Sequence, residues 1–438
     1  MAKVLLIGNG GREHCIAETL CRSREKTELF AYMSAKNPGI AKFSSGFEIG
    51  KSGDLDAMKK YALKIKPDFV VVGPELPLSM GIVDELDGHN IPCIGPTKEL
   101  AKLETSKSFT RLLMQKYRID ACPKFKIFEN LSGINEFLEE LGEYVIKPDG
   151  LTGGKGVKVF GEHIQNSKEA INYCREVLAQ HASVIVEEKL EGEEFSYQCI
   201  VDGKHVIGSP LAQDHKRAFE NDMGPNTGGM GSYSCENHLL PFVSKQEADR
   251  ALEITEEMLS AINKECGEQY KGIMYGGFIV TKDGVKLIEY NARFGDPEAM
   301  NVLPILESDF VEMCFAVIEK TLNKNKIKFQ NKATVCKYAV PNGYPESPVS
   351  GEIKLSKIPK DAKLYFASVD EQNGRLVLKG SRTIAFVGIA DTLKDAEKLS
   401  EDAIKSAEGP IFHRSDIGTD ELTQKRINHM NRLRMKDD

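Results

Sequence analysis

The sequence predicts a multidomain protein of the α/β and α+β classes, with a doubly wound parallel sheet in its N-terminal part. The chain has 438 residues, and domains usually hold roughly 150, which suggests about three domains. The first hundred residues alternate short apolar runs that end in glycine with helical stretches, a pattern typical of a parallel sheet covered on both faces. Later strand and helix candidates alternate less regularly, as they do in α+β domains.

Composition narrows the class of protein. There are 58 basic and 65 acidic side chains, and the net charge of −7 argues against a general nucleic-acid binder. No apolar run approaches the roughly 18 residues of a membrane span, and the start MAKVLLIGNGG resembles a strand and turn, not a signal peptide. The ten cysteines show no C-x-x-C spacing. We therefore expect buried thiols in a cytoplasmic protein with neither nucleic-acid nor membrane partners.

The first half of the chain predicts two units. Residues 1–105 hold apolar runs at 3–8, 68–73 and 91–95, the strands of the doubly wound N-terminal domain. Pro96 begins a predicted helix that continues to about Lys116. Residues 106–190 then form a small α+β lobe, with strands at 125–128, 143–147, 156–160 and 183–187 and a helix from about Ser167.

The second half also predicts two units. Residues 191–325 hold strands at 195–201, 205–210, 276–281 and 285–291, and a helix that begins at the capping box of Ser244 and Glu247. Residues 326–438 form an α+β C-terminal domain with a strand at 333–340 and a helix at 392–405. The polar tail after about residue 424 is expected to fray, apart from a short helix.

Gly8-Asn-Gly-Gly-Arg-Glu-His14 follows the first strand, where a dinucleotide fingerprint would stand. Glu13 occupies the place of its third glycine, and no strand-end acid for a ribose follows, so the motif fits NAD poorly. A turn whose amides meet a phosphate, with Arg12 adding charge, remains open. A tight turn without a ligand explains this motif equally well.

Lys147-Pro-Asp-Gly-Leu-Thr-Gly-Gly-Lys-Gly156 is glycine-rich but lacks the Walker A order. Its amides could point at phosphates, with Lys155 as counter-charge. A flexible hairpin loop is the alternative, and Lys147 at the end of the preceding strand favours the phosphate interpretation. The acidic stretch 186–194 could be a solvated face, or a connection between lobes whose free backbone groups bind a base.

Leu287-Ile-Glu-Tyr-Asn-Ala-Arg-Phe-Gly-Asp-Pro-Glu298 is the most informative stretch. Glu289 and Asn291 share one face of a strand and offer hard oxygen ligands suited to Mg²⁺. Arg293 could clamp a carboxylate or a phosphate. A satisfied polar end of an edge strand is the alternative. The preceding strand, 275–281, offers no acid or amide as a further ligand.

Gln213-Asp-His-Lys-Arg217 and Pro225-Asn-Thr-Gly-Gly-Met-Gly231 complete the set of motifs. The second is glycine-rich enough to fold over an anion, and both could also be ordinary surface loops. In their order and spacing, GNGGREH, KPDGLTGGKG, QDHKR, GPNTGGMG, IEYNARFGDPE and HRSDIG resemble the ATP-grasp ligases. Within that superfamily the chain resembles, from end to end, the glycinamide ribonucleotide synthetase family (phosphoribosylamine–glycine ligases) of purine biosynthesis.

The resemblance implies an ATP-grasp fold and a ligase that phosphorylates the carboxylate of glycine and then joins it to 5-phosphoribosylamine. The residues implied to contact ATP are Lys107, Lys147, Gly153, Gly154, Lys155, Gly156, Glu187, Leu190 and Glu194. Those implied to hold phosphoribosylamine are Gly10, Gly11, Arg12, Asn226, Thr227, Gly228, Gly229, Met230 and Gly231. The implied ligands of Mg²⁺, or of Mn²⁺ in its place, are Glu289 and Asn291, and Arg293 and Asp214 would orient glycine.

The expected partners are therefore glycine, 5-phosphoribosylamine and ATP, bound by a monomer. Another carboxylate–amine ligase of purine synthesis is the nearest alternative, and the PNTGGMG motif disfavours it. A dinucleotide-dependent oxidoreductase and an inactive ATP-binding module are alternatives from other classes. The incomplete fingerprint disfavours the first of these, and the full set of Lys147, Lys155, Glu289, Asn291 and Arg293 disfavours the second.

Overall fold

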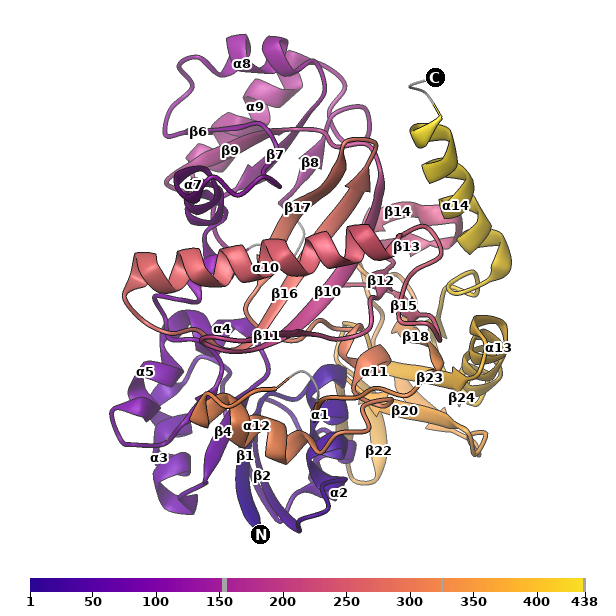
Figure 1. The fold of residues 1–438 in the computed structure, drawn as a ribbon. Coiled ribbons are helices and arrows are strands. Elements are labelled where there is room, and N and C mark those ends of the chain that lie inside the picture. The colour runs from indigo at the N-terminus through magenta and orange to yellow at the C-terminus, as the bar shows by residue number, and fades with distance from the viewer. Residues whose placement is uncertain (152–155, 324–325, 436–438) are drawn as a thin grey trace.

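The structure is a computed structural model that describes residues 1–151, 156–323 and 326–435 (Figure 1). Gly153, Gly154 and Lys155, which the sequence assigns to the ATP phosphates, lie outside the described residues.

The N-terminal part is a five-stranded parallel sheet in the order β3-β2-β1-β4-β5, as predicted. Its strands are β1 (Ala2–Ile7), β2 (Thr27–Met33), β3 (Gly46–Ile49), β4 (Phe69–Val72) and β5 (Cys93–Ile94). Its helices are α1 (Gly11–Cys21), α2 (Pro38–Phe43), α3 (Leu55–Ile65), α4 (Glu75–Met80) and α5 (Ile82–Asp87). Alternate residues of β1 enter two different cores, Val4 and Leu6 one of them and Leu5 and Ile7 the other. Both faces are therefore buried, which explains the continuous apolar runs.

The helix predicted from Pro96 to Lys116 is wrong as a single element. The structure has α6 (Lys102–Thr105) and α7 (Lys107–Tyr117), separated by Ser106 in an extended conformation. The Ser106 hydroxyl accepts a hydrogen bond from the Phe109 amide at 3.1 Å, so Ser106 is the N-cap of α7. The cap places Lys107 at the first position of a new helix.

The small lobe is an antiparallel sheet in the order β6-β9-β7-β8, covered by two helices (Figure 1). Its elements are β6 (Phe125–Phe128), α8 (Ile134–Leu141), β7 (Tyr144–Pro148), β8 (Lys158–Val159), α9 (Ser167–Leu178) and β9 (Val184–Glu188). This lobe has a hydrophobic core of its own, whereas a second, continuous core runs through the N-terminal, central and C-terminal parts.

The central part is an antiparallel sheet in the order β11-β10-β16-β17, with α10 lying across it (Figure 1). Its elements are β10 (Glu193–Asp202), β11 (Val206–Gly208), α10 (Lys245–Cys266), β16 (Lys271–Thr281), β17 (Gly284–Asn291), α11 (Ala299–Val302) and α12 (Phe310–Glu319). The predicted capping box is present, because the Ser244 hydroxyl accepts from the Glu247 amide and the Glu247 carboxylate accepts from the Ser244 amide.

The segment between β11 and α10 holds β12 (Gln213–Asp214), β13 (Arg217–Phe219), the 3₁₀ turn η1 (Glu220–Asp222), β14 (Met223–Asn226) and β15 (Gly231–Ser234). Strands β12 and β15 join the sheet β12-β15-β18-β23-β20 of the C-terminal part. The QDHKR motif and the glycine-rich motif of the central part are thus both built onto a C-terminal sheet.

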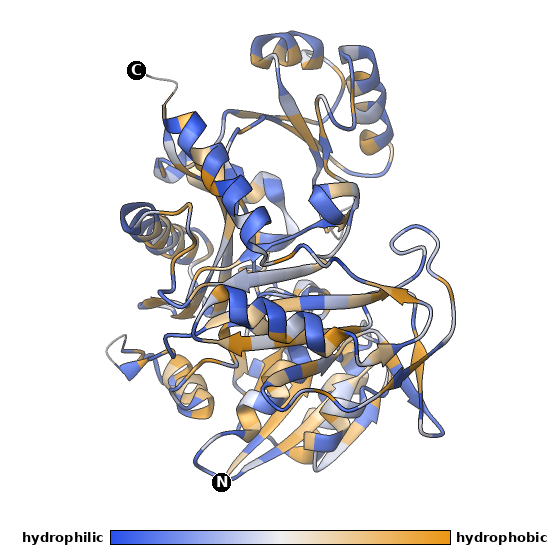
Figure 2. Ribbon diagram, turned by 90° about the vertical axis from the view of Figure 1, so that its right-hand side faces the viewer, coloured by the Kyte–Doolittle hydropathy of each residue, from blue (hydrophilic) through white to orange (hydrophobic). Residues whose placement is uncertain are grey.

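The C-terminal strands are β18 (Ala333–Pro341), β19 (Glu352–Leu355), β20 (Ala362–Phe366), β21 (Val369–Gln372), β22 (Arg375–Leu378), β23 (Ile384–Ala390), β24 (Ala407–Glu408) and β25 (Ile411–Phe412). Helix α13 (Leu393–Ile404) confirms the predicted helix. Residues Asp420–Arg434 form the helix α14, so the helix in this region begins earlier and is longer than the short one expected after residue 424. Although α14 is mostly hydrophilic (Figure 2), it buries Met430 and Leu433.

Candidate functional site

Strand β17 presents the two predicted metal ligands on one face. It pairs with β16 in a register that sets Glu289 opposite Gly277 and Asn291 opposite Tyr275. The Asn291 Oδ1 atom accepts a hydrogen bond from Arg293 Nη2 at 3.2 Å. Within the described residues the Glu289 carboxylate accepts no hydrogen bond. Several positively charged side chains act on it electrostatically.

The charge of Glu289 fits a divalent cation. Burial alone would raise the pKa of its carboxyl, but Lys216, Lys107 and Lys147 outweigh burial and hold the pKa below its ordinary value. A charged carboxylate without a hydrogen-bond partner and a neighbouring amide oxygen are the kind of donors that Mg²⁺ or Mn²⁺ accepts. The residues present therefore fit the metal that the sequence implies.

Lys107 and Lys147 both lie within electrostatic reach of this carboxylate. Lys107 Nζ donates to the Gly150 carbonyl at 2.9 Å, and burial, together with the nearby Lys147, lowers the pKa of its ammonium group. Lys147 Nζ donates to Glu187 Oε2 at 2.6 Å. Two part-buried ammonium groups around one acid form a local positive charge inside an acidic chain, suited to polyphosphate.

Glu187 lies in a buried ion cluster. Its Oε1 accepts from Arg111 Nε at 2.6 Å and its Oε2 from Arg111 Nη2 at 3.1 Å, in addition to Lys147. Burial would raise its pKa, but Arg111 and Lys147 lower the pKa to about 2. Sequence reasoning missed Arg111. Its spacing of four residues from Lys107 on one helix was the available signal, because i and i+4 share a face.

Of the remaining residues predicted to contact ATP, Leu190 and Glu194 follow β9 and Gly156 precedes β8. Leu190 is half-buried in the connection from β9 to β10, where the Lys189 amide donates to the Glu143 carbonyl at 3.2 Å. Glu194 is exposed, and its Oε2 lies 3.4 Å from Lys216 Nζ. The Gly156 carbonyl accepts from the Tyr173 hydroxyl at 2.7 Å.

The turn before α1 is occupied by carboxylates of the protein itself. The Gly10 amide donates to Glu13 Oε2 at 2.6 Å, and the Arg12 amide donates to the Asp296 carboxylate. A Cβ atom at Gly11 would collide with the Tyr338 hydroxyl, which itself donates to Asp296 Oδ1 at 2.6 Å. The helix N-terminus expected to meet a substrate anion therefore already carries two internal acids.

The glycine-rich loop 226–231 is joined to the QDHKR segment by backbone hydrogen bonds. The Thr227 amide donates to the Lys216 carbonyl at 2.7 Å, and the Met230 amide to the His215 carbonyl at 2.8 Å. Gly229 has φ +107°, and a Cβ atom there would lie 2.5 Å from Asp214 Oδ1, so this close approach requires glycine. Glycine thus lets the loop lie directly against Asp214.

Asp214 itself is held in an unusual state. Within the described part of the chain its buried Oδ1 has no hydrogen-bond partner. Burial, followed by the nearby Glu298, raises the pKa of its carboxyl well above the ordinary value. A buried carboxylate oxygen without a partner suits a ligand cation, since an ammonium group would both pair with it and lower the pKa of the carboxyl.

Arg293 is held by two acids from the N-terminal half. Its Nη2 lies 2.9 Å from Glu104 Oε1 and its Nε 3.4 Å from Glu75 Oε2. Arg293 and Asp214 both lie within electrostatic reach of Glu298. The structure thus brings the two predicted glycine-orienting residues near one buried glutamate.

Arg382 is a second residue that sequence reasoning missed. Its Nη1 donates to the carbonyls of Gly228 at 2.6 Å, Asp296 at 2.5 Å and Gly229 at 3.3 Å. Its guanidinium carbon lies 4.9 Å from the centre of the Tyr338 ring. This C-terminal side chain joins the two loops of the central part, and its neighbours in the sequence carry no motif that would have revealed it.

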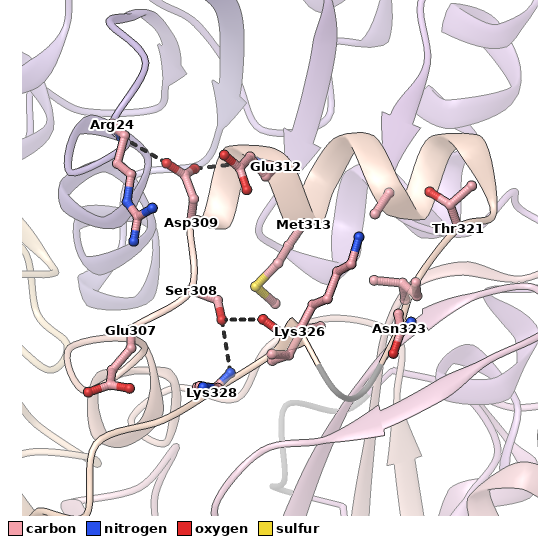
Figure 3. A pocket seen from close by; sticks show the side chains of 13 residues that line it. Arg24, Glu307, Ser308, Asp309, Glu312, Met313, Thr321, Asn323, Lys326 and Lys328 are labelled. Atoms are coloured by element: carbon pink, nitrogen blue, oxygen red, sulfur yellow. Dashed lines mark hydrogen bonds between the residues drawn. The ribbon is translucent and has the colours of Figure 1, made fainter.

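A separate cavity of about 470 Å³ lies beside α12, lined by Arg24, Asp309, Met313 and Lys328 among others (Figure 3). None of the predicted site residues lines it. Several of its polar groups already bind one another, since Ser308 Oγ donates to the Lys326 carbonyl at 2.8 Å and accepts from the Lys328 amide at 2.9 Å. This cavity is therefore distinct from the site around Glu289.

Comparison with solved structures defines the class: the fold is that of the ATP-grasp ligases. A crystal structure of phosphoribosylamine–glycine ligase from Thermotoga maritima matches with a TM-score of 0.80 and 26% identity, over 95% of this chain and 100% of that chain. A biotin carboxylase from Campylobacter jejuni, 16% identical, shares the fold with a TM-score of 0.75 over 99% of both chains.

Three family models cover most of the chain: the phosphoribosylglycinamide synthetase N domain matches residues 2–104, its ATP-grasp (A) domain residues 105–299, and its C domain residues 334–420. A phosphoribosylamine–glycine ligase from Methanocaldococcus jannaschii is 49% identical over 99% of this chain and 100% of its own length. One from Methanocella arvoryzae is 46% identical over the same shares. The chain belongs to the phosphoribosylglycinamide synthetase family.

Membership confirms the ATP-grasp fold predicted from the motifs and implies the use of ATP and a divalent cation. None of the helices within the described ranges combines the length and apolar character that a membrane span requires. All ten cysteines lie in the described residues and are free, seven of them buried.

Proposed function

We propose that this chain joins glycine to 5-phosphoribosylamine at the expense of ATP, forming glycinamide ribonucleotide, ADP and phosphate in purine biosynthesis. The observation that carries the proposal is the identity of 49% over 99% of the chain to a phosphoribosylamine–glycine ligase. The cations gathered around Glu289 supply the physical support, because they neutralise the charge that phosphoryl transfer develops.

The proposed reaction has two steps. A carboxylate oxygen of glycine attacks the γ-phosphorus of ATP, the bond to ADP breaks, and glycyl phosphate forms. The nitrogen of phosphoribosylamine then attacks the acyl carbon, an amide bond forms, and phosphate leaves with the electron pair of the broken C–O bond. The chain's task in both steps is to position groups and to neutralise charge.

We assign the nucleotide contacts to the side of the small lobe. Lys107 and Lys147, with Gly153 to Gly156, would bind the phosphates; residues 187–190 would bind adenine and Glu194 the ribose. Glu289 and Asn291 would hold Mg²⁺ or Mn²⁺, which supplies Lewis-acid stabilisation of the phosphates. Since the side chain of Glu187 is already paired, its contribution to adenine would come from the backbone.

We assign the two other substrates to the loops of the central part. Arg293 would orient the glycine carboxylate and Asp214 its ammonium group, since the buried Oδ1 atom of Asp214 has no hydrogen-bond partner in the described residues. The loop 226–231 and the turn at Gly10 to Arg12 would hold phosphoribosylamine. Because two carboxylates already occupy that turn, it would receive the amine and the ribose hydroxyls of this substrate, and not its phosphate.

We further propose the division into units at 1–105, 106–190, 191–325 and 326–438, a cytoplasmic location, and action as a monomer. The separate core of the small lobe supports the second unit. Ten free thiols accord with a reducing compartment.

A coupled assay of ADP release, with each substrate omitted in turn, tests the proposal. ADP should form only when glycine and phosphoribosylamine are both present, and Glu289→Gln should remove the activity while the protein stays folded. Equal ADP release without glycine would disprove the substrate assignment. The dinucleotide alternative predicts a change in NADH fluorescence on adding protein, and we expect none, because Glu13 fills the turn where a dinucleotide fingerprint has glycine.

A further inference from the structure

Residues near the C-terminus contact the tip of a hairpin. The base of this hairpin continues into the proposed substrate loop 226–231. The hairpin consists of β13, η1 and β14, residues 217–226. Figure 1 shows β13 and β14 lying beside α14. We call the residues that hold its tip, Arg414, Asp416 and Arg426, the C-terminal clamp.

Asp222 at the tip is bound through both carboxylate oxygens. Arg414 Nη1 lies 3.1 Å from its Oδ1, and Arg426 Nη2 lies 2.5 Å from its Oδ2. The Arg414 side chain is fully buried. Breaking such a pair leaves a charge with little access to water, so this contact is far more costly to lose than a surface ion pair.

The clamp also fixes the backbone of the tip. The Asn221 amide donates to Asp416 Oδ2 at 2.9 Å, and Arg414 Nη1 donates to the Arg217 carbonyl at 3.1 Å. Asn221 and Asp222 have φ values of +59° and +62°, a left-handed conformation that L-residues adopt rarely. Contacts at both side chain and backbone over-determine this strained turn.

The base of the hairpin leads directly into the site. Arg217 pairs with Asn226, and the hydrogen bonds from the Thr227 and Met230 amides to residues 216 and 215 continue the ladder into the loop 226–231. His215, buried beneath this region, adds no polar anchor, because neither of its ring nitrogens has a partner among the described residues. Arg217 at the base pairs with Glu162 of the small lobe, so polar contacts anchor the hairpin at its base as well as at its tip.

We propose that the C-terminal clamp is a positioning device for the amine substrate: by holding Asp222 it fixes the hairpin and, through its base, the loop 226–231. Asp222 and Arg426 are thus positioning residues that act through the loop. The identity of the substrate in this inference rests on the proposed function. The structural link between the tip and the loop does not.

The test compares Asp222→Asn with Asp222→Glu and with the control Asp361→Asn in the full-length protein. Asp361 is exposed and forms no ion pair in the described structure. Asp222→Asn should raise the KM for phosphoribosylamine about tenfold, a coupling of ordinary size, while kcat and the KM values for ATP and glycine stay unchanged. Asp222→Glu should restore part of the loss, and Asp361→Asn should match the wild type.

Hydrogen exchange supplies a readout that does not depend on the substrate. The amides of Thr227 and Met230 should lose protection in Asp222→Asn and keep it in Asp361→Asn. If wild type releases no ADP with both substrates present, the proposed function fails, and hydrogen exchange still decides the link from tip to loop. Unchanged protection, or an equal rise of all three KM values, would overturn the proposal.

Discussion

At the scale of single residues, Glu187 and Arg111 determine where the Lys147 ammonium group lies. The Glu187 carboxylate faces one ammonium and one bidentate guanidinium in a buried cluster. Arg111 also donates to the Ile288 carbonyl at 2.7 Å, so it ties the small lobe to the strand that carries Glu289. A lysine that must serve a phosphate can leave Glu187 only because Arg111 remains to neutralise the acid.

Arg111→Gln should therefore act on both stability and nucleotide binding. Removing one partner of a buried charge pair costs about 3–5 kcal/mol of unfolding free energy, and Lys147 would be held more tightly by the remaining acid. We expect the KM for ATP to rise, with denaturant unfolding and initial rates as the measurements. Arg118→Gln, the same change at an exposed position just after α7, should alter neither, and equal stability of both variants would refute the argument.

The sequence predicts the role of a residue best when its contacts are to residues nearby in the chain. Glu289 and Asn291 follow from the two-residue period of one strand, which is local geometry. Arg382 contacts loops about 150 and 90 positions earlier in the chain, and no local pattern can encode such a contact. The occupation of the first turn by Asp296 is equally non-local.

At the scale of elements, polar contacts determine where helices begin and end in places where hydrophobic periodicity alone does not. The run from residue 96 to 116 has apolar residues near a helical period, but Ser106 serves as a cap and divides it. Helix α14 looked too polar to persist, yet Met430 and Leu433 are buried and Arg426 and His429 contact Glu193. Parallel strands and capping boxes, in contrast, have strong local signals and were predicted correctly.

Helix α13 is fastened to β18 by a buried cluster that should make its stability depend on pH. Lys337 Nζ, fully buried on β18, lies 2.6 Å from Glu397 Oε1 and 2.9 Å from Glu401 Oε2. Burial would raise the pKa of Glu401, but His413 and Lys337 outweigh burial and lower it to about 2, below the ordinary 4.5. The stabilising charge is thus fully present above about pH 4.5 and is lost as the pH falls toward 2.

Glu401→Gln removes this titration. The unfolding free energy of the variant should lie below that of the wild type by about 2 kcal/mol at pH 7, less than the full pKa shift implies because water screens this partly exposed carboxylate. The gap should narrow between pH 4.5 and 2. Thermal unfolding across that range measures it, with Asp402→Asn, at the more exposed neighbouring acid, as the matched control. A gap that does not change with pH would show that Glu401 contributes by packing alone.

At the scale of the whole molecule, the site forms only where three parts of the chain meet. Asp296 receives the Arg12 amide from the N-terminal part and the Tyr338 hydroxyl from the C-terminal part. The single core that runs through these parts holds them together, whereas the small lobe with the nucleotide-binding lysine has its own core. In the proposed function, this division sets the loops assigned to glycine and phosphoribosylamine on the shared core and the lysine assigned to ATP on the separate lobe.

Arg382 tests this division. It joins the C-terminal part to the loop 226–231 and to the loop that carries Asp296, and it contacts no residue of the small lobe within the described structure. In Arg382→Gln a charged donor to three carbonyls is lost, and such hydrogen bonds are worth about 1.5–3 kcal/mol each. We expect the KM for phosphoribosylamine to rise about tenfold or more, while the dissociation constant of ATP stays unchanged.

Steady-state rates and nucleotide titration on the same preparations measure the two effects separately. Arg375→Gln is the matched control, since the side chain of Arg375, at the start of β22 in the same part, is exposed and within the described residues pairs only with Glu352. Arg382→Lys should recover little, because an ammonium group lacks the planar fork that reaches several carbonyls while lying over the Tyr338 ring. If Arg382→Gln weakened the binding of ATP as much as that of phosphoribosylamine, the small lobe and the parts that share the continuous core would have to act as one body.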